Sequence, residues 1–410
     1  MALYAFDGTW NEDEEANTHD TNVVKFRDLY QGPVEYRTGV GTRFGAIGHA
    51  LGGLFGMGGH SRVEEMYDAL TTNWQHGDQI IDIIGFSRGA ALAVHFSNLI
   101  AKVGIKGADG GIERPPIRFL GVWDIVGSFG LPIDFIIHFH DINIGWTIDS
   151  VPDCVAHCFH ALAIEERRQS FEPTRLNVGN RVPAIEELWF RGVHSDVGGG
   201  NGNVARNNIA LQWMLEKARG SGLPISSSAV QVVAAAADPL APIRHNFDPI
   251  PNPRRPIQPG DRFHPTAVPR ALAVGESAHF PVRAADKYNW SGVQLQQSAT
   301  YQFDIGPSER WIDGGIPCGP QGWKSEDLPW LQGTFIGWFE NRRRCPEANW
   351  FELVGSLGDE GDTLFRIREG GPEHRYTAPR TDDLYAFAND LVSKYGNNQG
   401  QLRVSVIRTA

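Results

Sequence analysis

The 410-residue sequence is poor in positive charge, in cysteine and in long apolar runs. It carries 37 Lys and Arg against 48 Asp and Glu, which gives a formal net charge of −11. Because phosphate backbones are bound by basic surfaces, this balance argues against a nucleic-acid partner. It also argues against electrostatic docking on anionic lipid, but it leaves hydrophobic contact with lipid open.

The four cysteines match no paired C-x-x-C zinc pattern. Cys318 and Cys345 lie in one C-terminal region and could form a disulfide. No stretch reaches the roughly 18 uncharged apolar residues of a membrane-spanning helix. The N-terminus lacks the basic start and apolar run of a Sec-type signal. We therefore expect a protein made in the cytoplasm without a Sec signal.

Residues 1–270 alternate between strand-like and helix-like segments. Four apolar or β-branched runs are candidate strands: Leu3–Phe6, Gln79–Gly85, Ile117–Val122 and Glu187–Val193. The segment Gly89–Ala101 has helical periodicity and small residues. Strand, turn and helix in succession predict the α/β class, with a mostly parallel sheet flanked by helices.

The chain changes character after residue 237. Proline recurs through residues 238–260 at a density that neither a helix nor a central strand tolerates, so we interpret this stretch as a long loop or a linker. Residues 271–410 carry short alternating runs separated by Gly, Asn and Asp, which is typical of an antiparallel β-sandwich. We predict two domains, 1–270 and 271–410.

The strongest local motif is the G-x-S-x-G run Gly85–Gly89, which follows a predicted strand and precedes a predicted helix. In this context the motif forms a sharp turn that lifts the hydroxyl of Ser87 off the sheet, with glycines for close backbone approach. The dipole of the following helix favours negative charge beside it. Ser87 is the predicted nucleophile, and the N–H of Arg88 is one predicted oxyanion donor. The second donor is expected after the first strand, at Gly8 or Thr9.

A serine hydroxyl needs a base to take its proton, so a histidine and a supporting carboxylate must follow in the order Ser, Asp, His. Asp124 and His194 keep this order, and each follows a predicted strand, where side chains face the site of a parallel sheet. A rival set pairs Asp196 with His264, also in order. We favour Asp124 and His194.

Six motifs follow one another in the first half of the chain. They are Phe6–Asn11, Thr21–Val23, Gly85–Ala90, Gly121–Asp124, Ala163–Arg168 and Trp189–Gly200. In this order they resemble the α/β-hydrolase family that includes the first class of type VI secretion lipase effectors, over about residues 1–270. The resemblance implies phospholipase A activity on a lipid or membrane-surface substrate. It also implies export by a type VI-like route, with a component of the secretion apparatus as partner.

The same resemblance implies roles for named residues. It supports Ser87, Asp124 and His194 as the catalytic triad. It also implies that Asp7 and Thr9 border the site, with Asp7 near the substrate.

A second resemblance lies near the C-terminus. The segments Asn389–Asp390 and Tyr395–Asn398, with Gly400 before the run Leu402–Arg408, resemble the calcium loop of the galactophilic bacterial lectin A. Ca²⁺ prefers carboxylate, amide and carbonyl oxygens. The candidate ligands are Asp390, Asn397, Asn398, the carbonyl of Lys394 and, by the resemblance, the backbone carbonyl of the distant Asp313. The resemblance implies a calcium-dependent site for a galactose-like sugar, whereas Asn and Gly also form metal-free polar hairpins.

Two glycine-rich apolar segments, Phe44–Gly59 and Phe129–Phe139, are candidate covers for an apolar cleft, or else ordinary core elements. The predicted function is a serine ester hydrolase, in first place a phospholipase A, whose hydrolytic chemistry needs no cofactor. The alternatives are a general carboxylesterase, a thioesterase, a peptidase, or a non-catalytic carbohydrate-binding protein on a hydrolase fold.

Overall fold

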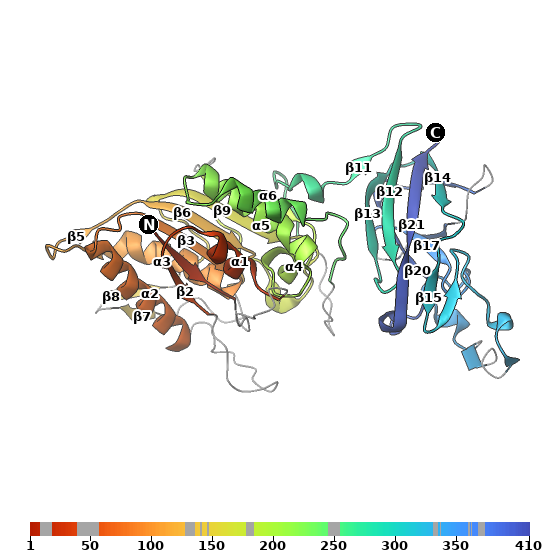
Figure 1. Cartoon of the computed structure of the whole chain (residues 1–410), viewed down its shortest axis with the longest axis horizontal. Helices are drawn as coiled ribbons and strands as arrows, with labels where there is room; N and C mark the ends of the chain where they lie inside the picture. The colour runs from red at the N-terminus through yellow and green to blue at the C-terminus, as the bar shows by residue number, and fades with distance from the viewer. Residues whose placement is uncertain are drawn as a thin grey trace. The chain divides into compact units, whose positions relative to one another are not determined.

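The computed structural model forms two compact units, Met1–Pro265 and Thr266–Ala410, which are described separately (Figure 1). The structure describes residues 1–8, 19–38, 57–127, 136–139, 142–145, 147–177, 184–244, 255–330, 335–336, 338–359, 361, 363–367 and 374–410. The division falls between Pro265 and Thr266, a few residues before the expected boundary near residue 271.

The first unit is built on a six-stranded sheet in the order β10-β9-β6-β3-β1-β2, in which every neighbouring pair is parallel. Its strands are β1 (Ala2–Phe6), β2 (Val34–Arg37), β3 (Ile81–Phe86), β6 (Ile117–Trp123), β9 (Val155–Ala163) and β10 (Ile185–Phe190). Strands β1 and β3 are buried along their whole length, as expected where both faces of a parallel sheet are covered. The predicted α/β class is confirmed.

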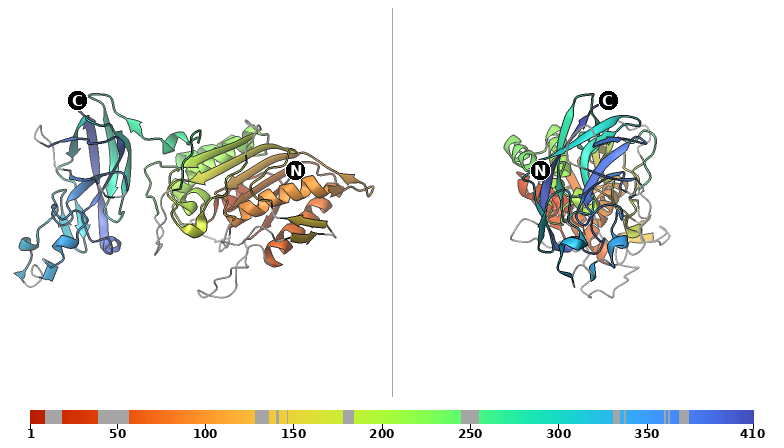
Figure 2. Two further views of the ribbon diagram at one scale, coloured as in Figure 1. Left: turned by 180° about the vertical axis from the view of Figure 1, so that it is seen from behind. Right: turned by 90° about the vertical axis from the view of Figure 1, so that its right-hand side faces the viewer.

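Helices cover both faces of this sheet (Figures 1 and 2). One core joins the sheet to α2 (Met57–Gln75) and α3 (Arg88–Val103). The other joins it to α1 (Asn22–Leu29), α5 (Val204–Gly220) and α6 (Ser227–Ala235). The short elements are η1 (Gln169–Phe171), α4 (His194–Gly198) and two small hairpin sheets, β4 (Ile105–Lys106) with β5 (Ile112–Glu113) and β7 (Ile136–Phe139) with β8 (Ile142–Gly145).

One predicted strand is shorter in the structure than expected, and two predicted covering segments lie largely or partly outside the described residues. The strand expected over Glu187–Val193 ends at Phe190, because Gly192, with φ +118°, turns the chain. The candidate cover Phe44–Gly59 lies almost entirely outside the described residues. Of Phe129–Phe139, the described part is β7, whose backbone pairs with β8.

The second unit contains two mostly antiparallel sheets, as a β-sandwich requires. One has the order β11-β13-β20-β17-β18: Arg270–Ala271, Asn289–Leu295, Asp382–Ala388, Leu353–Leu357 and Leu364–Arg366. The other has the order β16-β15-β21-β14-β19: Ile316–Cys318, Trp311–Asp313, Asn398–Arg408, Thr300–Ile305 and Arg375–Thr377. Strand β12 (Ser277–Arg283) also pairs with β21. Burial alternates along β12 and β14, so every second side chain faces the core.

Four short 3₁₀ helices lie among the described residues between Pro265 and Asn397: η2 (Pro265–Ala267), η3 (Ser325–Asp327), η4 (Glu340–Arg342) and η5 (Tyr395–Asn397). Cys318 and Cys345 are not joined, and each is a free thiol. Burial raises the pKa of Cys318 to about 12. None of the helices in the described part of the chain combines the length and the apolar character that a membrane-spanning helix needs.

Candidate active site

Three of the predicted side chains meet at the carboxyl edge of the parallel sheet. Ser87 directly follows β3, Asp124 directly follows β6, and His194 begins α4 shortly after β10. Strands β3, β6, β9 and β10 are consecutive neighbours in the sheet. Because parallel strands end at a common edge, residues far apart in the sequence are brought to one place.

The turn that carries Ser87 is sharply bent. Ser87 has φ 59° and ψ −124°, a backbone conformation that costs free energy in a residue other than glycine. The flanking glycines explain how the turn fits. A Cβ at Gly85 would lie 2.6 Å from the carbonyl oxygen of Gly89, and a Cβ at Gly89 would lie 2.3 Å from that of Phe6. The ends of β1 and β3 and the first turn of α3 are thus in backbone contact, which fixes Ser87 at the crest.

Asp124 and His194 form a buried hydrogen-bonded pair. His194 Nδ1 lies 2.6 Å from Asp124 Oδ2, and the two side chains are almost completely buried. The His194 ring stacks on Phe86 at 4.6 Å between centroids and meets Phe171 edge-on at 4.8 Å. Phe86 immediately precedes Ser87, so the imidazole lies beside the turn. Among the described residues, no hydrogen bond joins the Ser87 hydroxyl to His194.

The Asp124 carboxylate also accepts hydrogen bonds from groups other than His194. Its Oδ1 accepts hydrogen bonds from the Ala163 amide at 3.0 Å and from Arg255 Nη1 at 2.6 Å, and Arg255 Nη2 lies 3.0 Å from Oδ2. Burial by itself would raise the pKa of Asp124, but the charges and hydrogen bonds of Arg255 and His194 hold this pKa below its ordinary value. The carboxylate is therefore ionised at neutral pH.

A second carboxylate supports the backbone at His194. Glu166 Oε2 accepts the His194 backbone N–H at 3.1 Å and pairs with Arg168 at 2.9 Å. Burial opposes ionisation of Glu166, yet its hydrogen bond and ion pair with Arg168 lower its pKa. The neighbouring Glu165 pairs with Arg191 at 2.8 Å. The residues after β9 thus hold the turn that presents the imidazole.

The predicted oxyanion donors lie beside the same turn. Arg88 begins α3 directly after Ser87, and burial lowers the pKa of its guanidinium to about 10. The Gly8 amide donates to Asp7 Oδ1 at 2.6 Å in this structure. Asp7 Oδ2 accepts the hydroxyls of Thr21 and Tyr36, both at 2.8 Å. Thr9 lies outside the described residues, and the oxyanion roles stay predictions.

The rival pair is placed differently. The Asp196 carboxylate accepts four hydrogen bonds, all from N–H groups: those of Val193, Asn201, Asn203 and Arg244. His264 stacks on Phe190 at 4.7 Å. Among the described residues the structure joins Asp124 to His194 and does not join Asp196 to His264.

Arg255 is one of two site residues that sequence reasoning missed. It belongs to the proline-rich stretch that we interpreted as a loop or linker, yet it is 6% exposed and bonded to Asp124. The available signal was an Arg-Arg pair among prolines, at 254–255. Phe171, which packs on His194, was missed as well.

In the second unit the proposed calcium ligands lie together. The register of β15 and β21 puts Asp313 opposite Asn398, whose Nδ2 donates to Asp390 Oδ2 at 3.1 Å. Asn398 Oδ1 is buried without a hydrogen-bond partner. A Cβ at Gly314 would lie 2.7 Å from Asn397 Nδ2, and the Lys394 carbonyl accepts the Asn397 amide at 3.1 Å.

The charges at this place repel one another. Burial and the nearby Asp390 raise the pKa of Asp313 to about 6. Burial also raises the pKa of Asp390. The half-buried Asp313 carboxylate, the buried Asp390 carboxylate and the unpartnered amide oxygen of buried Asn398 together suit a cation.

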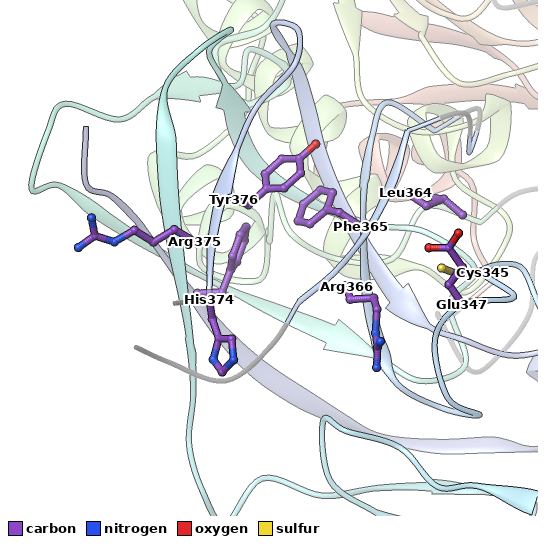
Figure 3. Close-up of a pocket in the computed structure, with 9 residues that line it drawn as sticks. Cys345, Glu347, Leu364, Phe365, Arg366, His374, Arg375 and Tyr376 are labelled. Carbon is purple, nitrogen blue, oxygen red and sulfur yellow. The ribbon is translucent and has the colours of Figure 1, made fainter. Parts of the chain in front are cut away.

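A separate cavity of about 320 Å³ lies in the second unit between the edge strands β18 and β19 (Figure 3). Phe365 and Tyr376 stack at 3.6 Å along one side, and Arg366 and Glu347 also line it. Arg366 pairs with Glu352 at 2.6 Å. This cavity includes none of the predicted catalytic or calcium-binding residues.

Comparisons with known proteins agree with the resemblance of the first half of the chain. A model of the family described as "T6SS, Phospholipase effector Tle1-like, catalytic domain" matches residues 3–113 and 108–217. No curated protein matches the sequence. Among solved structures, an uncharacterized protein from Pseudomonas aeruginosa is 20% identical, covering 57% of this chain and 48% of its own, with a TM-score of 0.37.

Two other solved structures are similar to parts of the chain. The Tle1 effector bound to the VgrG spike from the type 6 secretion system is 22% identical over 50% of this chain and 51% of its own, with a TM-score of 0.35. The EclA N-terminal domain, a PllA-like lectin, is 17% identical over 32% of this chain and 95% of its own, with a TM-score of 0.23, and matches the C-terminal region. The chain spans about half the length of the first two proteins.

Proposed function

This chain belongs to the Tle1-like family of type VI secretion phospholipase effectors, and from that premise we propose that it cleaves carboxylic esters of glycerophospholipids as a phospholipase A. Family membership supports a lipid hydrolase. The observation that carries the proposed mechanism is the buried Asp124–His194 pair beside the strained turn of Ser87. This arrangement has the parts of a serine hydrolase: a presented hydroxyl, a base, and a carboxylate that orients the base.

In the proposed reaction His194 takes the proton of the Ser87 hydroxyl as the oxygen attacks the ester carbonyl. Asp124 accepts the hydrogen bond from Nδ1, which fixes the ring tautomer and stabilises the imidazolium that forms. The backbone N–H of Arg88, with that of Gly8 or Thr9, donates a hydrogen bond to the carbonyl oxygen and stabilises the negative charge that develops there. His194 then returns its proton to the leaving alcohol, and water releases the acyl group from Ser87.

We also propose that the second unit binds calcium through Asp390, Asn397, Asn398 and the carbonyls of Lys394 and Asp313. The unpartnered Asn398 Oδ1 beside Asp390 fits such an ion, because a buried amide oxygen without a partner is costly unless a ligand satisfies it. When bound, Ca²⁺ would offset the two carboxylates and offer coordination positions to sugar hydroxyls. A galactose-like sugar is the proposed ligand.

Export by a type VI-like route is proposed on the family alone, with a spike component of the secretion apparatus as the partner. A solved relative is described as bound to such a spike. The proposal is tested by co-purification of the full chain with a spike protein from the same secretion system.

The lipase proposal is tested by mass spectrometry of vesicles made from a mixed phospholipid extract. The wild-type chain should release fatty acid and lysophospholipid, and Ser87→Ala should release neither above the uncatalysed rate. The position of the acyl chain that is lost distinguishes the A1 and A2 reactions. Equal release by both proteins would refute Ser87 as the nucleophile. Turnover of thioesters or simple esters, but not phospholipids, would favour the alternatives instead.

A further inference from the structure

Arg255 forms a buried ion pair with Asp124. The residue is 6% exposed, and its guanidinium makes a two-pronged contact with Asp124, through Nη1 at 2.6 Å and Nη2 at 3.0 Å. The same nitrogens donate to the carbonyls of Ala163, at 2.8 Å, and Phe171. Planar forks of this kind fix a carboxylate in both position and orientation.

Those contacts join three parts of the site. Asp124 follows β6, Ala163 ends β9, and Phe171 ends η1. The ring of Phe171 packs against His194. Arg255 lies near the C-terminal end of the proline-rich stretch 238–260. One side chain thereby holds the carboxylate, the neighbouring strand end and the ring that borders the imidazole.

Arg255 also changes the electrostatics of the triad. Asp124 faces a permanent cation on one side and His194 on the other. Both of its oxygens accept hydrogen bonds from the guanidinium, and Oδ2 alone meets the histidine. Part of the negative charge that would stabilise a protonated imidazole is therefore already offset.

We propose that Arg255 is a positioning residue of the triad: it fixes the Asp124 carboxylate toward His194 and offsets part of the negative charge that this carboxylate presents to the imidazole. This inference rests on the proposed serine-hydrolase mechanism. It concerns how the base is held ready and adds no group that touches the substrate.

Several other groups face or support His194 from the elements packed around it. The residues after β9 contribute Glu166, on the His194 backbone N–H, together with its partner Arg168. Within α4 itself, Asp196 bonds only to N–H groups other than that of His194. From β3 and η1, Phe86 and Phe171 contribute uncharged rings. Among described groups Arg255 is thus the cation bonded directly to the carboxylate that faces the ring.

The test uses full-length Arg255→Gln and Arg255→Lys, with Arg118→Gln as the matched control. Arg118 forms a two-pronged pair with the buried Asp82, at 2.9 and 2.5 Å, near the amino ends of β3 and β6. The Arg118→Gln substitution therefore removes a comparable ion pair at the opposite end of the same strands. Thermal unfolding checks that each variant is folded.

The first readout is an NMR pH titration of the His194 ring in selectively labelled protein, with the signal assigned through His194→Gln. In Arg255→Gln the ring should become protonated at higher pH than in the wild type, because the full charge of Asp124 then favours the imidazolium. Arg118→Gln should titrate as the wild type does. An unchanged His194 titration in a folded Arg255→Gln protein would overturn the proposal.

The second readout is kinetic. The acid limb of the kcat/KM profile for Arg255→Gln should move to higher pH, and kcat should fall on the order of 10-fold to 100-fold with little change in KM, because the carboxylate is no longer held in place. Arg255→Lys should keep the wild-type pH limb but lose kcat, since an ammonium offers charge without the planar fork. If Arg255→Gln does not fold, a wild-type kcat in Arg255→Lys overturns the proposal.

The two hypotheses fail separately. A wild-type chain without Ser87-dependent hydrolysis of any ester refutes the proposed function, while the NMR titration still tests Arg255. An active wild type whose His194 titration is indifferent to Arg255→Gln refutes the positioning role alone.

Discussion

His194 Nδ1 lies 2.6 Å from Asp124 Oδ2, although 70 residues separate them in the chain. The contact exists because β6 and β10 run parallel on either side of β9 and end at one edge of the sheet. It decides which nitrogen of the imidazole faces the carboxylate and leaves Nε2 for the proposed role of the base.

Asp124→Asn should lower kcat by roughly 10⁴, judged from other serine hydrolases, because the amide no longer fixes the ring tautomer or balances the imidazolium. It should also reduce the free energy of unfolding by about 3–5 kcal/mol, since it leaves the buried Arg255 without its counter-charge. Steady-state kinetics and chemical denaturation measure the two effects. A variant with near-normal kcat would refute the triad.

His264→Gln should leave kcat within about threefold of the wild type, because the structure places this ring on Phe190 and not against a catalytic carboxylate. Asp196→Asn should mainly reduce stability, since its carboxylate accepts four N–H groups around α4. Ester hydrolysis rates and melting temperatures separate these cases. A loss of kcat in His264→Gln as large as in His194→Gln would favour the rival triad.

Gly89→Ala should destabilise the chain by about 1–3 kcal/mol, because the added methyl would lie 2.3 Å from the carbonyl oxygen of Phe6 and 2.4 Å from that of Asp7. It should also lower kcat by disturbing the turn at Ser87. Gly220→Ala, in α5, is the control, since nothing lies within 4 Å of its added methyl. Similar unfolding curves for the two variants would contradict the proposed close approach of β1 and α3.

Calcium should raise the melting temperature of the full chain at pH 7.5, and Asp390→Asn should abolish this increase. Asp304→Asn, on β14 in the same unit, is the control that removes one negative charge elsewhere and should keep it. Isothermal titration should show weaker binding at pH 5 than at pH 7, because protonation of the Asp313 carboxyl group, whose pKa is about 6, removes negative charge beside the ion that the Asp313 backbone carbonyl helps to bind. Equal affinities at the two pH values would contradict this role.

The calcium-free chain should respond to pH in the opposite sense. The pKa of Asp313 in the folded state, about 6, lies above its ordinary value of 3.8, so folding favours the protonated carboxyl. This group therefore adds stability as the pH falls through 6 toward 3.8, and that contribution is absent above pH 6. Melting temperatures with a chelator should show this trend, and Asp313→Asn should reduce it.

Much of the site could be predicted because its residues stand at strand ends. A G-x-S-x-G between a strand and a helix fixes the geometry of Ser87, and Asp124 and His194 follow apolar runs that the sheet brings together. Strand β9, at Val155–Ala163, was not predicted because two histidines and a cysteine interrupt its apolar pattern. A strand that is buried on both faces is hard to recognise from its apolar pattern when it contains polar residues that are paired inside the protein. His160 is such a residue, because it is hydrogen-bonded to Glu187.

Arg255 could not be predicted for a different reason. Its bond to Asp124 spans 131 residues, and it comes from a stretch with no periodicity to place it in space. In the second unit, the opposition of Asp313 and Asn398 depends on the register of β15 and β21. Residue patterns do not determine which distant strand is a neighbour, so a resemblance was needed there.

The anchoring of Arg255 bears on where this protein can be shortened. The stretch that matches the family ends at residue 217, and a fragment cut there would keep Ser87, Asp124 and His194. It would, however, expose a buried carboxylate whose counter-ion had been removed with the tail. The smallest autonomous hydrolase fragment should therefore extend to Pro265, where the first compact unit ends.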